Sequence, residues 1–286
     1  MDIREVKFFK YNHCFEISHN NRRMIITTDV GPRILFFGFE NENILFIDER
    51  EKIKREKWKI IGGHRFWVSP ETEDAYVPDN DKCMVESSKD FVKVFKLDKK
   101  TGLEKSIIIS VDGDDFIVKH ILINRGEMLY QGGIWALTCI IPEGTIFFPW
   151  TTPGEWKMKK IIYWEKWPGQ STNIDSTQFI RGKDLFLIKV NGEMSKVGTT
   201  GYEGFLGVSN RNYTFIKKFN FIQGAIYPDD NCAIEIYTSK NFCELETLSP
   251  ITTLIPEVPL IHIERWKLID RFIDPSDGGA IRKVLK

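Results

Sequence analysis

Apolar and polar side chains alternate with a period of two along much of the chain. The run 116–123 reads FIVKHILI, and similar short runs recur at 33–39, 91–97, 103–111, 184–190, 205–209, 212–219, 233–238 and 260–269. A period of two puts successive side chains on opposite faces of a strand, whereas a helix repeats every 3.6 residues. The pattern therefore predicts a chain built almost entirely from β-strands.

Turn residues separate these runs at regular intervals. Asp112-Gly113-Asp114 and Asn191-Gly192 are signals for two-residue hairpins, because Asn, Asp and Gly tolerate the positive φ of such turns. The strand count predicts two packed antiparallel sheets, a large all-β sandwich. No Ser/Gly/Pro tract resembles a linker, so residues 1–286 are expected to form a single domain, with a loosely ordered tail at 274–286.

The charge composition argues against two classes of binding partner, nucleic acids and membrane surfaces. Lys+Arg and Asp+Glu both number 40, whereas a nucleic-acid or membrane-surface partner would call for a basic surplus. Neither partner is expected. The five cysteines contain no C-x-x-C pair, which argues against a zinc site and a disulfide framework. Charges at residues 2–7 lie where a signal peptide needs apolar residues, so a cytoplasmic location is expected.

A first candidate site lies at residues 62–71, GGHRFWVSPE. It brings four chemically useful side chains together: His64, Arg65, Trp67 and Glu71. Imidazole can move protons near neutral pH, and the Arg fork binds oxygen atoms. The alternative is a structural bend in which both side chains are paired internally. In a regular strand His64 and Arg65 point to opposite faces, so both line one cleft only if the glycines create a bulge.

A second candidate site lies on the hairpin at residues 233–247. Glu244 and Glu246 are two apart on an expected strand, which places them on one face about 6.6 Å apart at a ~3.3 Å rise per residue. At an effective dielectric of about 20 they repel by roughly 2.5 kcal/mol, enough to raise one pKa. Candidate compensating cations are Arg65, Lys196 and Lys217. The alternative is that both carboxylates face water.

Tryptophans supply candidate stacking surfaces. Trp150, Trp156, Trp164 and Trp167 lie in a stretch rich in Pro and Gly, which is typical of loops. Such residues either cap an edge of the core or offer flat apolar faces to the C–H groups of a sugar ring. Trp67 and Trp135 are further candidates.

Three motifs together resemble the galactose mutarotase-like superfamily, which contains the aldose 1-epimerases. They are Gly31-Pro32-Arg33-Ile34, Gly62-Gly63-His64-Arg65 and Leu245-Glu246-Thr247, with the pattern around Glu71 and Pro250 resembling a microbial branch. The resemblance implies a β-supersandwich, a sugar or oligosaccharide as ligand, and Glu246 as general base. The implied reaction opens and recloses a sugar ring by general acid and base catalysis, without a metal or cofactor.

The chain departs from this family at one point. The family carries its general acid on a histidine in mid-chain, but the corresponding segment 131–137, QGGIWAL, has none. His64 is then the best candidate acid, and Arg65 or Glu71 are the alternatives for that role. The substrate-binding candidates are Arg65, Trp67, Glu71, Trp135, Lys196, Lys217 and Glu244. Two alternatives stay open: a carbohydrate-binding protein without catalysis, and a glycoside hydrolase or lyase that uses Glu71 and Glu246.

Overall fold

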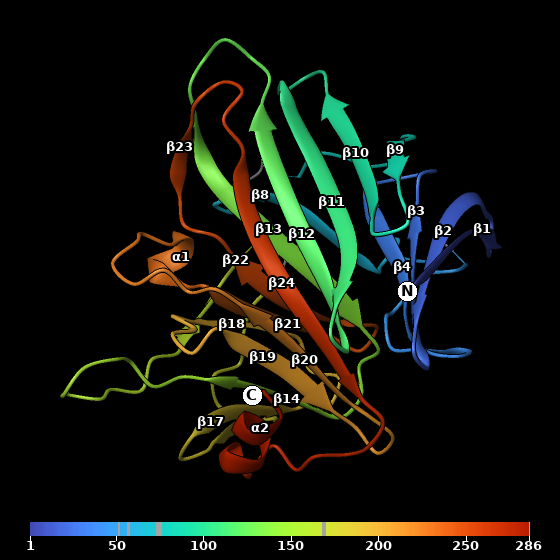
Figure 1. Ribbon diagram of the computed structural model, residues 1–286. Coiled ribbons are helices and arrows are strands. Elements are labelled where there is room, and N and C mark those ends of the chain that lie inside the picture. The colour runs from blue at the N-terminus through green and yellow to red at the C-terminus, as the bar shows by residue number, and fades with distance from the viewer. Residues whose placement is uncertain (51, 56–57, 73–75, 168–169, 286) are drawn as a thin grey trace.

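The computed structural model describes residues 1–50, 52–55, 58–72, 76–167 and 170–285. About 52% of the chain is strand and 4% is helix. Two large antiparallel sheets pack face to face, and their central strands cross at an angle (Figure 1). The predicted all-β sandwich is confirmed.

The first sheet has twelve strands and carries the candidate site. Its strands follow the order β1 (Asp2–Phe8), β2 (Tyr11–His19), β3 (Arg22–Thr27), β4 (Arg33–Phe39), β8 (His64–Ser69), β13 (Tyr130–Ile140), β22 (Cys243–Leu248), β21 (Ile234–Thr238), β18 (Ser195–Thr199) and β15 (Ile162–Tyr163), while β5 (Glu42–Asn43) pairs with β4 and β23 (Thr252–Leu254) with β13.

The second sheet has ten strands and closes the sandwich. Its order is β16 (Phe179–Arg181), β17 (Leu185–Lys189), β14 (Thr145–Pro149), β19 (Phe205–Ser209), β20 (Thr214–Phe219), β24 (Leu260–Ile269), β12 (Asp115–Asn124), β11 (Leu103–Asp112), β10 (Val92–Asp98) and β9 (Met84–Ser87). The short strands β6 (Lys54–Arg55) and β7 (Trp58–Lys59) pair with each other, and the helices are α1 (Pro228–Asn231) and α2 (Gly278–Val284).

Alternating residues of both sheets meet in one apolar core. Phe37 on β4 packs against Phe116 on β12 and Trp266 on β24, with ring centroids 5.4 and 5.2 Å apart. All three side chains are fully buried. Edge-to-face packing of this kind stabilises the contact beyond the burial of area alone. One face of the first sheet therefore packs against the core, and the opposite face can carry a binding site.

The turn predictions have different outcomes. Residues 113–114 form the expected two-residue hairpin, because Asp112 pairs with Asp115 across it. Asn191-Gly192 does not form a hairpin. Both edges of β17 are already occupied by β14 and β16, so the chain crosses at this turn to β18 in the other sheet.

The tail is more ordered than the sequence suggested. Residues 278–284 form α2, whose N-cap Asp277 accepts a hydrogen bond from the Ala280 N–H at 2.9 Å. Ile281 is fully buried in an apolar cluster with Phe147 of β14 and Leu185 of β17. Figure 1 shows α2 beside these two strands. The short helix is thus held in place by its apolar contact with the second sheet, although it begins with a Gly pair. Within the described residues, no helix has the length and apolar character needed to span a membrane.

Candidate functional site

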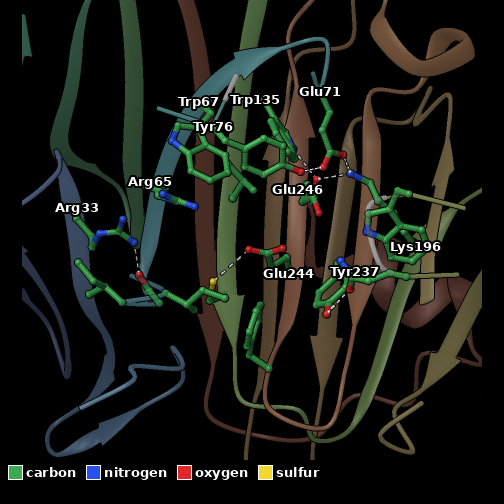
Figure 2. Close-up of a pocket in the computed structure, with 18 residues that line it drawn as sticks. Arg33, Arg65, Trp67, Glu71, Tyr76, Trp135, Lys196, Tyr237, Glu244 and Glu246 are labelled. Atoms are coloured by element: carbon green, nitrogen blue, oxygen red, sulfur yellow. Dashed lines mark hydrogen bonds and ion pairs between the residues drawn. The ribbon is translucent and has the colours of Figure 1, made fainter. Parts of the chain in front are cut away.

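A cavity opens on the face of the first sheet that points away from the core (Figure 2). Its floor comes from strands β8, β13, β22, β21 and β18, which lie side by side in the sheet. Its lining residues are Arg33, Ile60, Ile61, Gly62, Arg65, Trp67, Glu71, Tyr76, Trp135, Leu137, Cys139, Trp167, Gln170, Lys196, Tyr237, Phe242, Glu244 and Glu246.

Strand register explains why residues far apart in the chain meet here. Leu137 on β13 pairs with Arg65 on one side and with Glu246 on the other. In antiparallel sheets directly opposed residues share one face, so all three point into the cavity. The next row brings Glu244 opposite Cys139 and Tyr237. The two predicted segments therefore meet on one open sheet surface.

Two glycines bring the chain into β8. Gly62 and Gly63 have φ of +83° and +71°, a region that favours glycine. A Cβ atom at Gly62 would lie 2.1 Å from the carbonyl oxygen of Phe46, and one at Gly63 would lie 2.1 Å from that of Ile34. The glycines thus permit a close backbone approach before β8. Beyond them the strand alternates regularly.

One ammonium group organises the carboxylates of the cavity. Lys196 forms an ion pair with Glu71, lies 3.0 Å from Glu235 and 3.8 Å from Glu246, and is almost fully buried. Burial alone would disfavour its charge, but the three carboxylates hold the Lys196 pKa well above its usual value. Its Nζ also lies 4.9 Å from the ring centroid of Trp135. Lys196 is therefore a fixed positive charge at the floor.

Glu246 is a buried carboxyl with a raised pKa. Its Oε2 accepts a hydrogen bond from the indole N–H of Trp135 at 2.5 Å, and its side chain is almost fully buried. Burial raises its pKa to about 7, with Glu244 adding to the rise and Lys196 opposing it. A carboxylate with a pKa near neutrality accepts protons far better than an ordinary glutamate.

Two further carboxyls have raised pKa values. Burial raises the pKa of Glu244, which faces the cavity and accepts a weak hydrogen bond from the Cys139 thiol at 3.4 Å. Burial raises the pKa of Glu235 more strongly, and its Oε2 lies 3.0 Å from the Lys196 ammonium. The site is therefore able to hold protons on carboxyl groups.

An arginine pair forms the opposite wall. Arg33 and Arg65 both bind Asp79, at 2.5 and 3.1 Å, and these pairs outweigh burial to hold the Asp79 pKa well below its usual range. The Arg65 guanidinium lies 3.5 Å from the ring centroid of Trp67. Two guanidinium groups facing one carboxylate leave a surplus positive charge beside the cavity.

Aromatic rings supply an apolar wall. Trp67 and Trp135 lie 5.7 Å apart between centroids, and Tyr76 packs edge-on against Trp67 at 5.0 Å. The Tyr76 hydroxyl donates to Glu71, which in turn contacts Lys196. Figure 2 shows the rings on one side of the Glu246 carboxylate and Lys196 on the other. Flat apolar faces next to charged oxygen-binding groups are the combination that pyranose rings need.

The structure brings seven of the nine predicted site residues to this cavity. They are Arg65, Trp67, Glu71, Trp135, Lys196, Glu244 and Glu246. His64 and Lys217 do not line it, and both lie in the interior of the sandwich.

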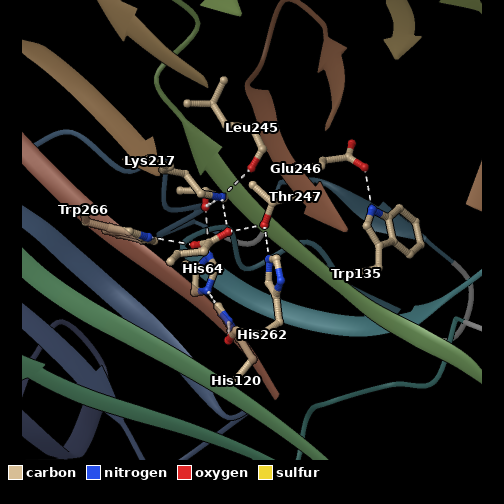
Figure 3. Close-up of polar contacts among 11 residues, drawn as sticks. His64, His120, Trp135, Lys217, Leu245, Glu246, Thr247, His262 and Trp266 are labelled. Carbon is tan, nitrogen blue, oxygen red and sulfur yellow. Dashed lines mark hydrogen bonds and ion pairs between the residues drawn. The ribbon is translucent and has the colours of Figure 1, made fainter. Parts of the chain in front are cut away.

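The prediction that His64 is the general acid is therefore wrong. Strand alternation places it on the face of β8 opposite Arg65, where it is fully buried between the sheets. Its Nε2 and Nδ1 lie 2.7 Å from His120 and 2.8 Å from Thr138 (Figure 3). Burial lowers its pKa well below the usual value. An imidazole that is sealed and neutral does not exchange protons with a ligand on the other face.

The prediction that Lys217 binds the substrate is wrong for a related reason. It comes from β20 in the second sheet and is fully buried, where it pairs with Glu264 at 2.8 Å. It also donates to the carbonyl oxygen of Leu245 at 3.0 Å (Figure 3). Lys217 thus touches β22 from behind, while Glu244 and Glu246 leave the same strand on the cavity side.

The interior cluster is also the one group with a metal-like arrangement among the described residues. Ligand atoms of His64, His120 and Glu264 lie within 4.8 Å of one another. Glu264 is already bound by Lys217 and by the indole N–H of Trp266 at 2.7 Å, and the two imidazoles bind each other. These polar groups are already paired with a cation or with hydrogen-bond partners. We therefore interpret the cluster as a structural network and not as a metal site.

Several site residues escaped sequence reasoning. Tyr76 reaches the cavity from the segment after β8, and no local pattern marks it. Arg33 reaches it from β4 and lies in the Gly31-Pro32-Arg33-Ile34 motif, but it was not predicted as a site residue. Glu235 had a usable signal, because it is a charged residue inside the apolar run 233–236 and aligns with Glu246. The loop tryptophans differ in their positions relative to the cavity. Trp167 lines the cavity, Trp164 lies over Lys196, and Trp156 is 87% exposed.

The comparisons with known proteins bear on the fold. No protein-family model matches the chain, and no curated protein matches its sequence. Among solved structures, an Escherichia coli K12 protein provisionally called an aldose 1-epimerase superposes with a TM-score of 0.62 at 12% identity, covering 90% of this chain and 99% of its own.

Two galactose mutarotase-like proteins are also similar. The one from Lactobacillus casei has a TM-score of 0.57 at 8% identity and covers 89% of this chain and 99% of its own. The one from Clostridium acetobutylicum has a TM-score of 0.57 at 9% identity and covers 94% and 98%. The chain therefore has the galactose mutarotase-like fold. Identities this low establish the fold alone, and function must be argued from the site.

Proposed function

We propose that the protein binds an aldose in the cavity of the first sheet and interconverts its anomers, with Glu246 as general base and Glu244 as general acid. The observation that carries the proposal is the pair of neighbouring carboxyls on β22, both facing one aromatic-walled cavity and both with raised pKa values. The fold shared with mutarotase-like proteins supports a sugar as ligand.

The reaction needs two proton transfers, one at the anomeric hydroxyl and one at the ring oxygen, which are both bonded to C1. Glu246, aligned by the Trp135 N–H, removes the proton of the anomeric hydroxyl. Glu244 delivers a proton to the ring oxygen, so the C1–O5 bond breaks and an open-chain aldehyde forms. Rotation about C1–C2 and the reverse transfers close the other anomer. Lys196 stabilises the negative charge that remains on Glu246 between turnovers.

The pH dependence of the rate tests the assignment of the base. Glu246 must be ionised to accept a proton, and its pKa is about 7. We expect kcat/KM to fall about tenfold per pH unit below about pH 7, because the protonated fraction grows as pH falls. Anomer exchange by proton NMR from pH 5 to 9, corrected for the uncatalysed rate at each pH, measures this. A rate that stays flat from pH 5 to 8 would contradict the assignment.

Sugar binding without turnover is the second candidate function. It is favoured by one observation: among the described residues, none of the cavity's lining side chains is a histidine. In that case the aromatic wall of Trp67, Tyr76 and Trp135 acts as a stacking platform. The NMR assay separates the two functions, because a binder leaves the anomer exchange rate unchanged.

Trp135→Ala tests the stacking surface under either function. We expect at least a tenfold loss of sugar affinity, since an aromatic stacking contact contributes about 0.5–1.5 kcal/mol and the Glu246 carboxylate also loses its N–H donor. Tryptophan fluorescence titration with mono- and oligosaccharides measures it. Trp156→Ala, at an 87% exposed position outside the cavity, is the control. Equal affinities for Trp135→Ala and the wild type would count against this wall as the binding surface.

Glycoside cleavage by Glu71 and Glu246 is less well supported by the geometry. Both carboxylates contact the Lys196 ammonium, which lies in the gap between them. A glycosidic oxygen and an attacking group would need that same space.

A further inference from the structure

A second pocket lies beside the sugar cavity and is unusual in its charge. It is lined by Gly31, Val77, Pro78, Asp79, Asp81, Lys96, Leu97, Asp98, Lys99, Lys100 and Lys105. Four of these eleven residues are lysines, contributed by β10, the turn that follows it, and β11. The segment 77–81 forms the other side, and Trp67 Nε1 ties it to β8 through the carbonyl oxygen of Val77 at 3.1 Å.

Lys105 stands out within this pocket. It occupies a position on β11 that faces the core, in line with Leu103 and Ile107, and is only 8% exposed. Among the described residues, its ammonium has no hydrogen-bond or ion-pair partner within reach. Burial lowers its pKa, and the charges of Asp79 and Asp98 oppose that effect. A buried unpaired charge is costly, so such a group normally has a counter-ion.

A like charge lies directly across from it. Lys96 on β10 pairs in register with Lys105 on β11, so the two side chains share one face. Like charges placed opposite each other on adjacent strands destabilise the pair. Strand pairing therefore concentrates positive charge at this point of the pocket.

The three carboxylates of the pocket are already engaged. Asp79 binds Arg33 and Arg65, and Asp81 accepts from Lys96 at 2.7 Å. Asp98 accepts from the backbone N–H of Lys100 at 2.9 Å. With four lysines, three aspartates and the two arginines behind Asp79, the formal charge of the cluster is positive.

We propose that this pocket is an anion site for a phosphate group, in which Lys105 supplies the inner contact and Lys96, Lys99 and Lys100 the outer ones. Lysine binds phosphate as a point charge, and several ammonium groups around one opening match a dianion better than a single carboxylate. The segment 77–81 connects this pocket to the sugar cavity, because Val77 accepts a hydrogen bond from Trp67 and Asp79 binds Arg65. The site is independent of the proposed sugar chemistry.

Titration with inorganic phosphate tests the site. Isothermal titration calorimetry at constant ionic strength, with chloride as the compensating anion, is expected to show saturable binding with one site per chain. Lys105→Met is expected to weaken that binding at least tenfold. Lys93→Met is the matched control, because Lys93 lies on β10 but pairs with Glu86 outside the pocket. Phenyl phosphate distinguishes a free anion from the phosphoryl group of a small organic ligand, since tighter binding of the ester indicates the latter.

Thermal unfolding provides a second measurement. Methionine has about the length of lysine and removes the unpaired charge, so Lys105→Met is expected to unfold at no lower temperature than the wild type in chloride buffer. Phosphate is expected to raise the unfolding temperature of the wild type but not that of the variant. If Lys105→Met does not fold, the double variant Lys99→Met/Lys100→Met at exposed positions carries the test, with a loss of affinity of about threefold or more. No saturable phosphate binding, or equal binding by the wild type and these variants, would overturn the proposal.

Discussion

Glu246→Gln is expected to slow anomer interconversion by about 10²- to 10⁴-fold while leaving the fold intact. This is the typical loss when a positioned proton acceptor is removed, and it corresponds to about 3 to 5 kcal/mol of barrier. Glutamine keeps the size of the side chain, and its amide oxygen still accepts the hydrogen bond from Trp135. Proton NMR time courses starting from pure anomers of a panel of aldoses measure the rate.

The stability of this variant provides an internal check. The folded-state pKa of Glu246 is raised to about 7 from a usual value of 4.5, so the folded protein binds this proton more tightly than the unfolded chain does. The carboxyl therefore costs increasing stability as pH rises from 4.5 to 7, and that cost is constant above this window. A neutral glutamine removes the cost. Glu246→Gln is thus expected to unfold at no lower temperature than the wild type at pH 8.

Two results would contradict the catalytic role. One is a wild-type protein that accelerates no aldose in the panel. The other is Glu246→Gln turning over at the wild-type rate. Glu155→Gln, at an exposed position outside the cavity, is the control for a nonspecific effect of the substitution and is expected to be fully active.

Lys217→Met is expected to lower the free energy of unfolding by about 3 to 5 kcal/mol. Lys217 and Glu264 are both fully buried and lie 2.8 Å apart, and removing one partner of such a pair leaves an uncompensated charge in the interior. The remaining donors to Glu264 are Thr247 and Trp266, which are neutral. Urea denaturation at pH 7, followed by circular dichroism, measures the change.

The control lies on the same sheet. Lys119 is next to the inward-facing His120 on β12, so its side chain points away from the core. Lys119→Met is expected to change stability by no more than about 0.5 kcal/mol. If Lys217→Met unfolds at the same urea concentration as the wild type, the buried ion pair does not stabilise the sandwich.

This second prediction also bears on the site. Lys217 donates to the carbonyl oxygen of Leu245 and to Thr138, which places it against the backs of β22 and β13. Glu246 and Leu137 leave those strands on the cavity side. The interior network in Figure 3 therefore lies behind β13 and behind β22, which carries Glu244 and Glu246, and His64, Lys217 and Glu264 do not line the cavity.

Local alternation was sufficient to place several predicted residues on one face of their strand. Arg65 and Trp67 lie two apart on β8, and Glu244 and Glu246 lie two apart on β22, so each pair shares a face whatever the rest of the fold does. The same rule excluded His64 from the face of Arg65 unless a bulge intervened. The glycines before β8 bend the chain but create no bulge within it, so His64 faces the core.

The sequence alone determined which runs form strands and which residues of a run share a face, because successive side chains of a strand point to opposite faces. The number of such runs and the turns between them were enough to predict a sandwich of two antiparallel sheets. The tertiary structure alone decided which strands became neighbours and which face of each met the core. Lys217 and Lys196 are both lysines on short strands, yet one comes from the second sheet into the interior and the other from the first sheet into the cavity. Sheet assignment depends on long-range pairing and on the burial of total apolar area, which no local pattern contains.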